Sequence, residues 1–368
     1  MTRRRVLVAI GTRPEAIKLA PVITALRARA EIDLHVLSTG QHADLLGPIL
    51  AFHQINLDSS LAVMRRGQSL DRLAARILVG VGQIFDAQSP DLVLVQGDTV
   101  SAFAAALAAH HRCIAIGHVE AGLRTGNLAA PWPEEAYRRM IASIATLHFA
   151  PTARARQALL TEGYAAASIH LTGNTVVDAV LAATARLGRD PALASGLDTV
   201  VTRSAGRRLV TVTAHRREND HAFPQIASAI DRLARDPALF VVAPLHPSAN
   251  ASAAFRKQLR DRDNVALLDP LDYPHFVRLM QLSHVILTDS GGVQEEASAL
   301  NKLVLVLRDT TERPEGIEAG TAQLVGTCPH RIVAATQSLL AQPPVRQHPC
   351  PYGDGRASER IADVVARH

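Results

Sequence analysis

The amino-acid sequence predicts an α/β protein with two doubly wound domains, each built on a parallel sheet. The first observation is the length of 368 residues, which is too long for one average core and suits two domains. The second is a repeated pattern of a short apolar run, a turn of small and polar residues, and an amphipathic stretch. The third is that most apolar runs lack polar alternation, which is typical of strands buried on both faces of a sheet.

The apolar runs form two sets of about six strands, and the helical stretches between them indicate βαβ units. In the first half of the chain we expect strands at residues 6–10, 34–37, 92–95, 113–116, 147–150 and 169–171. In the second half we expect strands at residues 209–212, 240–243, 265–268, 285–287, 303–307 and 324–325. Each half therefore has enough strands for one doubly wound sheet.

The domain boundary is predicted from the weakest periodicity, which lies over residues 190–206. Residues 342–355 are rich in Pro and Gly and are expected to form a loop, after which the spacing of apolar residues is helical. We expect residues 1–170 and a last helix over residues 357–368 to form the N-terminal domain. Residues 171–356 form the C-terminal domain.

Composition and charge favour a globular enzyme in the cytoplasm. Hydrophobic residues make up 48% of the chain, aromatic residues only 4%, and the net charge is +5. Because the basic residues are dispersed, we expect neither a nucleic-acid nor a membrane partner. Arg3-Arg4-Arg5 is not followed by the apolar stretch of a signal peptide. The odd number of cysteines, Cys113, Cys328 and Cys350, and their spacing predict free thiols in a reducing compartment and no metal site.

Polar clusters follow six of the predicted strands, at the edge of an open α/β sheet where ligands bind. They lie at residues 11–15, 96–99, 117–122, 213–219, 246–247 and 289–292. A single cluster of this kind is more often an ordinary loop than a site. Six of them at the carboxyl ends of two sheets predict an active site.

Four residues are the candidates for proton transfer. Asp98 and Glu120 come just after apolar strands, and Glu134 follows the rigid segment Pro131-Trp132-Pro133. Grouped carboxylates can serve as a paired proton donor and acceptor. Asp98 could instead cap the next helix, and Glu134 suits a helical first turn. His215 could stabilise a leaving diphosphate or move a proton.

A second set of residues suits a phosphate-bearing ligand. Arg13, at a predicted helix start, could form a bidentate pair with phosphate, and Lys18 lies about one turn beyond Pro14. The turn at Ser290, Gly291 and Gly292 opens a helix, so its backbone could approach a diphosphate. The alternative is a tight strand-to-helix turn. Glu296 could accept hydrogen bonds from ribose hydroxyls.

These motifs resemble those of the non-hydrolysing UDP-N-acetylglucosamine 2-epimerases, nearly from end to end. The first half of the chain has the matching segments Gly11-Thr12-Arg13-Pro14-Glu15-Ala16-Ile17-Lys18, Val119-Glu120-Ala121-Gly122-Leu123-Arg124-Thr125 and Pro131-Trp132-Pro133-Glu134-Glu135. The second half has Ala214-His215-Arg216-Arg217-Glu218-Asn219, Asp289-Ser290-Gly291-Gly292-Val293-Gln294-Glu295-Glu296 and Arg308-Asp309-Thr310-Thr311-Glu312-Arg313-Pro314-Glu315. The resemblance implies two Rossmann-like domains of the glycosyltransferase-B type, with the nucleotide sugar in the cleft between them.

The resemblance also implies an activity, namely interconversion of UDP-N-acetylglucosamine and UDP-N-acetylmannosamine through elimination of UDP to a 2-acetamidoglucal and its re-addition. No nicotinamide or other cofactor is implied, and Gly11-Thr12-Arg13-Pro14 lacks the glycine spacing of a dinucleotide site. In this reading Asp98, Glu120 and Glu134 are the acid–base groups and His215 assists near the diphosphate. The expected substrate contacts are Arg13, Lys18, Phe276, Ser290, Gly291, Gly292, Glu296 and Arg313. We also expect a homodimer.

Some members of the family bind a second UDP-N-acetylglucosamine as an activator. The matching places here are held by Gln41, His42, Arg66, Gln68, Arg216 and His246. Asp44 stands where a second Gln is expected, so both an activated and a non-activated enzyme fit the sequence.

Three alternative functions stay open. A glycosyltransferase of the same architecture would need an acceptor site and not three acid–base carboxylates. An epimerase could act on a modified UDP-hexosamine, such as a diacetamido uronic acid. A UDP-sugar sensor would bind without turnover, and the three carboxylates argue against it.

Overall fold

A computed structural model describes residues 3–368 except residues 66, 217–218, 246–248, 261 and 343–348. Contacts divide the chain into two compact units. Unit 1 comprises Met1–Ala179 and Gly353–His368, and unit 2 comprises Val180–Tyr352. The sequence-based boundaries at residues 170 and 357 lie close to these divisions.

Unit 1 contains a parallel sheet of seven strands in the order β3-β2-β1-β4-β5-β6-β7. Its strands are β1 (Arg4–Ile10), β2 (Ile32–Ser38), β3 (Ser59–Ser60), β4 (Leu92–Gln96), β5 (Ala115–Val119), β6 (Leu147–Ala150) and β7 (Ile169–Leu171). The pairing of β1 with both β2 and β4 places the switch in strand order between β1 and β4. Ligands of doubly wound sheets bind at such a switch point.

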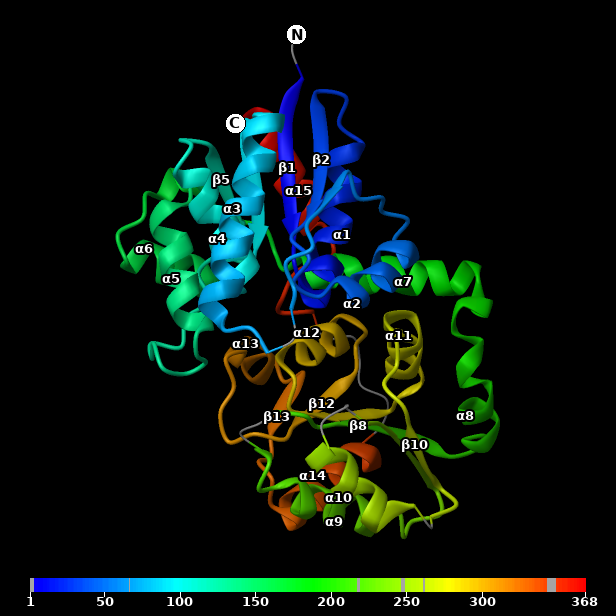
Figure 1. Cartoon of the computed structure of the whole chain (residues 1–368). Coiled ribbons are helices and arrows are strands. Elements are labelled where there is room, and N and C mark those ends of the chain that lie inside the picture. Colours follow the sequence, from blue (N-terminus) through cyan, green and yellow to red (C-terminus); the bar gives the residue numbers. More distant parts are fainter. Residues whose placement is uncertain (1–2, 66, 217–218, 246–248, 261, 343–348) are drawn as a thin grey trace. The chain divides into compact units, whose positions relative to one another are not determined.

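Some helices of unit 1 begin with a side-chain cap. The helices of this unit are α1 (Arg13–Arg27), α2 (Ala43–Phe52), α3 (Leu70–Gln88), α4 (Val100–His110), α5 (Glu134–Ile144), α6 (Ala153–Thr161), the 3-10 helix η1 (Ala166–Ser168) and α15 (Ala357–Arg367). The chain passes between the units within α7 (Thr175–Arg189). Thr12 caps α1 and Thr99 caps α4 through their hydroxyl oxygens. Helix α4 is rich in alanine, so it packs closely on α3, and Figure 1 shows the two helices side by side.

The C-terminal helix α15 is anchored to unit 1 by a buried carboxylate. Asp178 accepts hydrogen bonds from the backbone N–H groups of Ala357 (3.2 Å) and Ser358 (2.7 Å) and from the Ser358 hydroxyl. These N–H groups have no partner inside the helix, and a carboxylate at this end also interacts favourably with the helix dipole. The helix packs against α1.

Unit 2 repeats the architecture with six parallel strands in the order β10-β9-β8-β11-β12-β13. The strands are β8 (Arg208–Thr213), β9 (Leu239–Pro244), β10 (Val265–Leu268), β11 (Val285–Thr288), β12 (Leu303–Val306) and β13 (Ala322–Leu324). The helices are η2 (Pro191–Leu197), α8 (Asp198–Arg203), α9 (Phe223–Leu233), α10 (Ala249–Leu259), α11 (Tyr273–Leu282), α12 (Gly291–Ala299), α13 (Pro314–Glu318) and α14 (Pro329–Ala341). Its switch point lies between β8 and β11.

The predicted fold class, two doubly wound parallel sheets, is confirmed, and every predicted strand is present. Four details differ. The strand predicted at residues 113–116 begins at Ala115, because Cys113 has a φ of 56° and lies in a left-handed turn. The last strand ends at Leu324, and the residues 190–206 form η2 and α8. The two-residue β3 was missed because it is too short to show a pattern.

Within the described parts of the chain, no helix is both long and apolar enough to cross a membrane.

Candidate active site

The turns after β1 and β4 lie at the switch point of the sheet in unit 1. The turn after β1 comes very close to α4, because a Cβ added to Gly11 would lie 2.0 Å from the Ser101 hydroxyl oxygen. Only glycine fits there without moving α4. Arg13, which begins α1, and Asp98, which follows β4, are therefore carried by neighbouring turns.

Glu15 joins these two turns. Its carboxylate accepts hydrogen bonds from the backbone N–H groups of Gly11 (2.7 Å) and Thr12 (2.6 Å) and from the Thr99 hydroxyl (2.5 Å). Burial raises the pKa of Glu15 to about 7, although these hydrogen bonds act in the opposite direction. Sequence reasoning gave Glu15 no role, but the spacing of Thr12 and Glu15 is that of a capping box and could have indicated one.

Asp98 is held by an arginine and stays accessible. Nε and Nη2 of Arg138 both lie 2.7 Å from its Oδ2, while a quarter of the Asp98 side chain is exposed. Arg138 is itself held by Glu135, whose Oε2 lies 3.2 Å from Nη1. Glu135 is fully buried and also accepts a hydrogen bond from the backbone N–H of Thr125. The Asp98 carboxylate is thus presented to solvent in a fixed orientation.

Glu120 is the most tightly held of the candidate carboxylates. Its Oε1 lies 2.5 Å from Lys18 Nζ and accepts a hydrogen bond from Asn174 Nδ2 at 3.1 Å. Gln96 Nε2 donates to the other oxygen. Glu120 has a φ of 67°, which is uncommon for a residue with a side chain and is a frequent sign of function. Lys18, expected as a substrate contact, is therefore placed next to Glu120.

Glu134 is the first residue of α5. Its Oε2 is buried and has no hydrogen-bond partner among the described residues. Glu134 and Arg138 are four residues apart, so both side chains lie on one face of α5. Because Arg138 contacts Asp98 and Gln96 contacts Glu120, the Asp98 and Glu120 carboxylates lie at the carboxyl ends of β4 and β5, and Glu134 lies on the face of α5 that carries Arg138.

A buried histidine helps to shape this edge of the sheet. Nε2 of His118, on β5, lies 2.7 Å from the carbonyl oxygen of Gly97. Burial lowers the pKa of His118 to about 4, so the ring is neutral at physiological pH and its Nε2–H donates to the carbonyl. His118 therefore ties the end of β4, next to Asp98, to β5.

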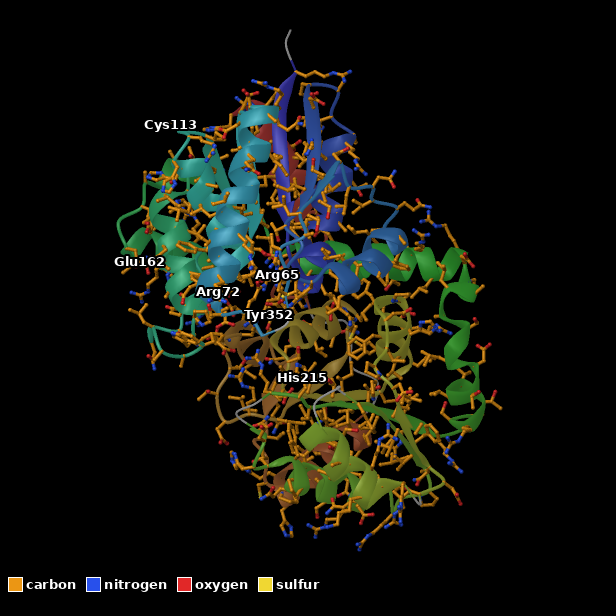
Figure 2. The ribbon with its side chains drawn as sticks, in the orientation of Figure 1. Arg65, Arg72, Cys113, Glu162, His215 and Tyr352 are labelled. Atoms are coloured by element: carbon orange, nitrogen blue, oxygen red, sulfur yellow. The ribbon has the colours of Figure 1, made fainter. Side chains whose placement is uncertain are left out.

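In unit 2, the turn after β8 is tied to the end of β11. Asp289 is completely buried and accepts hydrogen bonds from the backbone N–H groups of His215 (3.0 Å) and Arg216 (2.9 Å) and from Asn219 Nδ2 (3.1 Å). One third of the His215 side chain is exposed, and its position in unit 2 is labelled in Figure 2. Sequence reasoning quoted Asp289 within a motif and gave it no role.

The turn after β11 has the features of an anion site. Ser290 is the N-cap of α12, and its hydroxyl makes no capping hydrogen bond. The first N–H groups of a helix are available to an anion, and Gly291 and Gly292 follow at once. A Cβ added to Gly291 would lie 2.8 Å from Cζ of Arg313, so that guanidinium lies against the glycine backbone. Arg313 is fixed by Glu295, with 2.9 Å between Nε and Oε1.

Other polar and aromatic groups of unit 2 lie on α11, on α12 and in the segment before α13. Glu296 is buried in α12, and Phe276 is half-buried on α11. Glu312 pairs with Arg308 at 2.8 Å. Burial would raise the pKa of Glu312, but the hydrogen bonds and charge of Arg308, with the charge of Arg313, lower it to about 2. Glu312 is therefore a permanent anion between two arginines.

The residues expected at a second, regulatory site lie in different surroundings. Gln41 Oε1 accepts a hydrogen bond from the Ser101 hydroxyl (2.6 Å), and Gln68 Oε1 accepts one from Arg76 (2.6 Å). His42 is half-buried, and burial lowers its pKa. Arg216 belongs to the turn held by Asp289. Arg66 and His246 lie outside the described residues.

The chain is similar to known proteins over almost its whole length. A family model described as UDP-N-acetylglucosamine 2-epimerase matches residues 24–366. A probable UDP-N-acetylglucosamine 2-epimerase of Ralstonia nicotianae is 47% identical, over 98% of each chain. The UDP-N-acetylglucosamine 2-epimerase of Yersinia pestis is 43% identical, over 99% of each chain.

A solved structure is also similar to this chain over almost the whole length of both proteins. It is the UDP-GlcNAc 2-epimerase of Neisseria meningitidis bound to UDP-GlcNAc, with a TM-score of 0.93 and 40% identity. The similarity covers 99% of this chain and 100% of that one. Together with the two parallel sheets, it confirms the predicted fold class of two Rossmann-like domains of the glycosyltransferase-B type.

Proposed function

The chain belongs to the UDP-N-acetylglucosamine 2-epimerase family, and from this premise we propose how its residues interconvert UDP-N-acetylglucosamine and UDP-N-acetylmannosamine. The protein is an isomerase with the epimerase function of its family. The observation that carries the proposal is the pair of carboxylates at the carboxyl ends of β4 and β5, Asp98 and Glu120, with Glu134 at the start of the neighbouring helix α5.

The chemistry explains why carboxylates are needed. The C2 proton of the sugar is not next to a carbonyl, so its direct removal is unfavourable. In the proposed route a carboxylate takes this proton as the electron pair of the C–H bond forms the C1–C2 double bond. The C1–oxygen bond breaks, and UDP leaves with that electron pair. UDP then returns to C1 while a proton is delivered to C2 of the 2-acetamidoglucal from the opposite face.

The surroundings of the three carboxylates suggest different parts in this route. Asp98 is fixed by Arg138 and exposed on one side, which suits the transfer of a proton to or from the sugar. Glu134 has an oxygen that no described residue hydrogen-bonds, and this suits a partner that acts on the opposite face. Glu120 is paired with Lys18 and so is less suited to proton transfer. We assign it to orienting the sugar and to stabilising the charge that develops there.

We assign the nucleotide mainly to unit 2. The Ser290 hydroxyl, the N–H groups of Gly291 and Gly292 and the Arg313 guanidinium suit the diphosphate, with His215 assisting its departure. Glu296 would accept hydrogen bonds from the ribose, and Phe276 would lie beside the uracil. Arg13 and Lys18 of unit 1 are proposed to contact the same substrate. A cytoplasmic location, a homodimer and activation by a second UDP-sugar stay predictions. Light scattering would test the homodimer, and substrate-saturation curves would test the activation.

Isotope incorporation tests the proposed route. In deuterated water, without added NAD or metal, the enzyme is expected to place deuterium at C2 of the epimerised sugar, because the carboxyl that takes the C2 proton exchanges with solvent. Oxygen label should also scramble between the bridging and non-bridging positions of the β-phosphate, because the C1–oxygen bond breaks. Mass spectrometry and NMR of the product measure both labels.

Two outcomes would count against this route. Epimerised product with no deuterium would indicate hydride transfer within the site and overturn the acid–base assignment of all three carboxylates. Sugar transfer to an added acceptor, with no epimer formed in its absence, would indicate a glycosyltransferase. A panel of UDP-hexosamines in the same assay identifies the sugar.

A thermal shift tests the nucleotide site. UDP at about 100 times its dissociation constant is expected to stabilise the native protein by about 2.7 kcal/mol, because it binds only the folded state. For a unit of this size the unfolding midpoint would rise by about 5–10 °C. ADP at the same concentration is the control for base recognition. Calorimetry should show a smaller shift for Glu296→Gln, and an unchanged midpoint for the wild type with saturating UDP would refute this site.

A further inference from the structure

The turn that presents His215 is shaped by one buried carboxylate. Asp289 comes directly after β11, and β11 pairs with β8, the strand that leads into His215. The two residues are 74 positions apart in the chain. The carboxylate is fully buried, and burying an unsatisfied charge would be costly. Its described donors all come from the turn after β8, so it sets the backbone conformation of that turn.

The same carboxylate faces the His215 ring. Oδ1 of Asp289 lies 3.6 Å from Nδ1 of His215 and also accepts a hydrogen bond from the His215 backbone N–H at 3.2 Å. Nδ1 and Nε2 lie on different sides of an imidazole, so a ring whose Nδ1 faces the carboxylate directs Nε2 elsewhere. One third of the His215 side chain is exposed, whereas Asp289 is not exposed at all. The buried carboxylate is thus expected to act on a ligand through groups that it contacts, among them the exposed histidine.

We propose that Asp289 is a positioning residue for His215. It orients the ring and stabilises its imidazolium through Nδ1, while Nε2 donates a hydrogen bond to the departing diphosphate. This inference rests on the proposed epimerase function. Orientation of a catalytic histidine by a buried carboxylate is a general device, because it fixes the ring and favours the charge formed during the reaction. Asn219 supports the carboxylate by donating to Oδ2 and to the carbonyl oxygen of Leu307.

A double-mutant cycle separates this role from a structural one. Asp289→Asn is expected to lower kcat by about 10²-fold or more, within the range for a misplaced acid–base group. The KM for the UDP-sugar and the dissociation constant for UDP should change by about threefold at most, because His215 acts on the departing group. In a His215→Gln background the same substitution should change kcat by less than about threefold, since the two residues act as a unit.

Asn264 offers a matched control in the same unit. Its buried side chain donates to the carbonyl oxygens of Ala234, Asp236 and Leu239, and it precedes β10 at the opposite edge of the sheet. Asn264→Ala should lower the melting midpoint but leave kcat within about twofold, since these hydrogen bonds only stabilise the fold. If Asp289→Asn does not fold, Asn219→Ala replaces it, because that variant removes one donor and keeps the carboxylate.

The outcomes are distinct. A loss of kcat in the wild-type background that disappears in the His215→Gln background supports the positioning role. If Asp289→Asn lowers kcat by the same factor in both backgrounds, the positioning role is overturned, and Asp289 acts elsewhere in the turn. An increase in KM without a decrease in kcat also overturns it. A wild-type protein that forms no C2 epimer refutes the proposed function instead, independently of the cycle.

Discussion

Asp98→Asn is expected to lower turnover by about 10²–10⁴-fold, the usual cost of losing one acid–base group. An amide has nearly the same shape as the carboxylate, and its oxygen can still accept a hydrogen bond from Arg138. It cannot accept the C2 proton. Arg138 also keeps its contact with Glu135, so the α5 side of the site should stay folded. The variant should therefore bind UDP normally and turn over very slowly.

A second Asp–Arg pair in unit 1 provides the control for this substitution. Asp86 accepts hydrogen bonds from Nε (2.7 Å) and Nη2 (2.8 Å) of Arg112, at the opposite edge of the sheet from Asp98. Asp86→Asn removes a charge from a similar pair, and we expect kcat within about twofold of the wild type, as for most surface substitutions. Coupled kinetics, UDP calorimetry and thermal melts should be run on both variants. Near-normal turnover of Asp98→Asn would remove Asp98 from the mechanism.

Glu120→Gln is expected to lose both activity and stability. The Lys18 ammonium would stay buried without its carboxylate, and breaking a buried ion pair from one side costs about 3–5 kcal/mol. Turnover should fall by about 10²-fold or more, since an electrostatic group aimed at the developing charge is lost. Denaturant unfolding and steady-state kinetics measure the two effects separately.

The double variant Lys18→Met/Glu120→Gln distinguishes the two roles of this pair. Removing both charges should recover much of the lost stability, because no uncompensated charge stays buried. Turnover should not recover, because the carboxylate is still absent and Lys18, a proposed substrate contact, is removed with it. If the double variant regained activity together with stability, Glu120 would be structural only, and Asp98 and Glu134 would have to carry the chemistry.

The strands could be predicted because their signal is local. A run such as Val6–Ile10 is continuously apolar because β1 is covered on both faces, and this is visible in a few neighbouring residues. The turn chemistry is also local: Thr12 and Glu15 form a capping box, and Ser290 with two glycines opens α12. The sequence alone therefore determined the fold class, and its long motifs identified the family that the comparisons confirm.

The tertiary structure alone decided which groups meet. Lys18 and Glu120 are 102 residues apart, Thr99 and Glu15 are 84 apart, and His215 and Asp289 are 74 apart. Each pair is formed because segments far apart in the sequence meet at the carboxyl ends of strands in one sheet, as the turns after β8 and β11 do. Strand order is set by packing of the whole domain, and no local pattern of residues encodes it. For this reason the partner of Lys18, a lysine expected to contact the substrate, and the contacts of Glu15 and Asp289 became visible only in the folded chain.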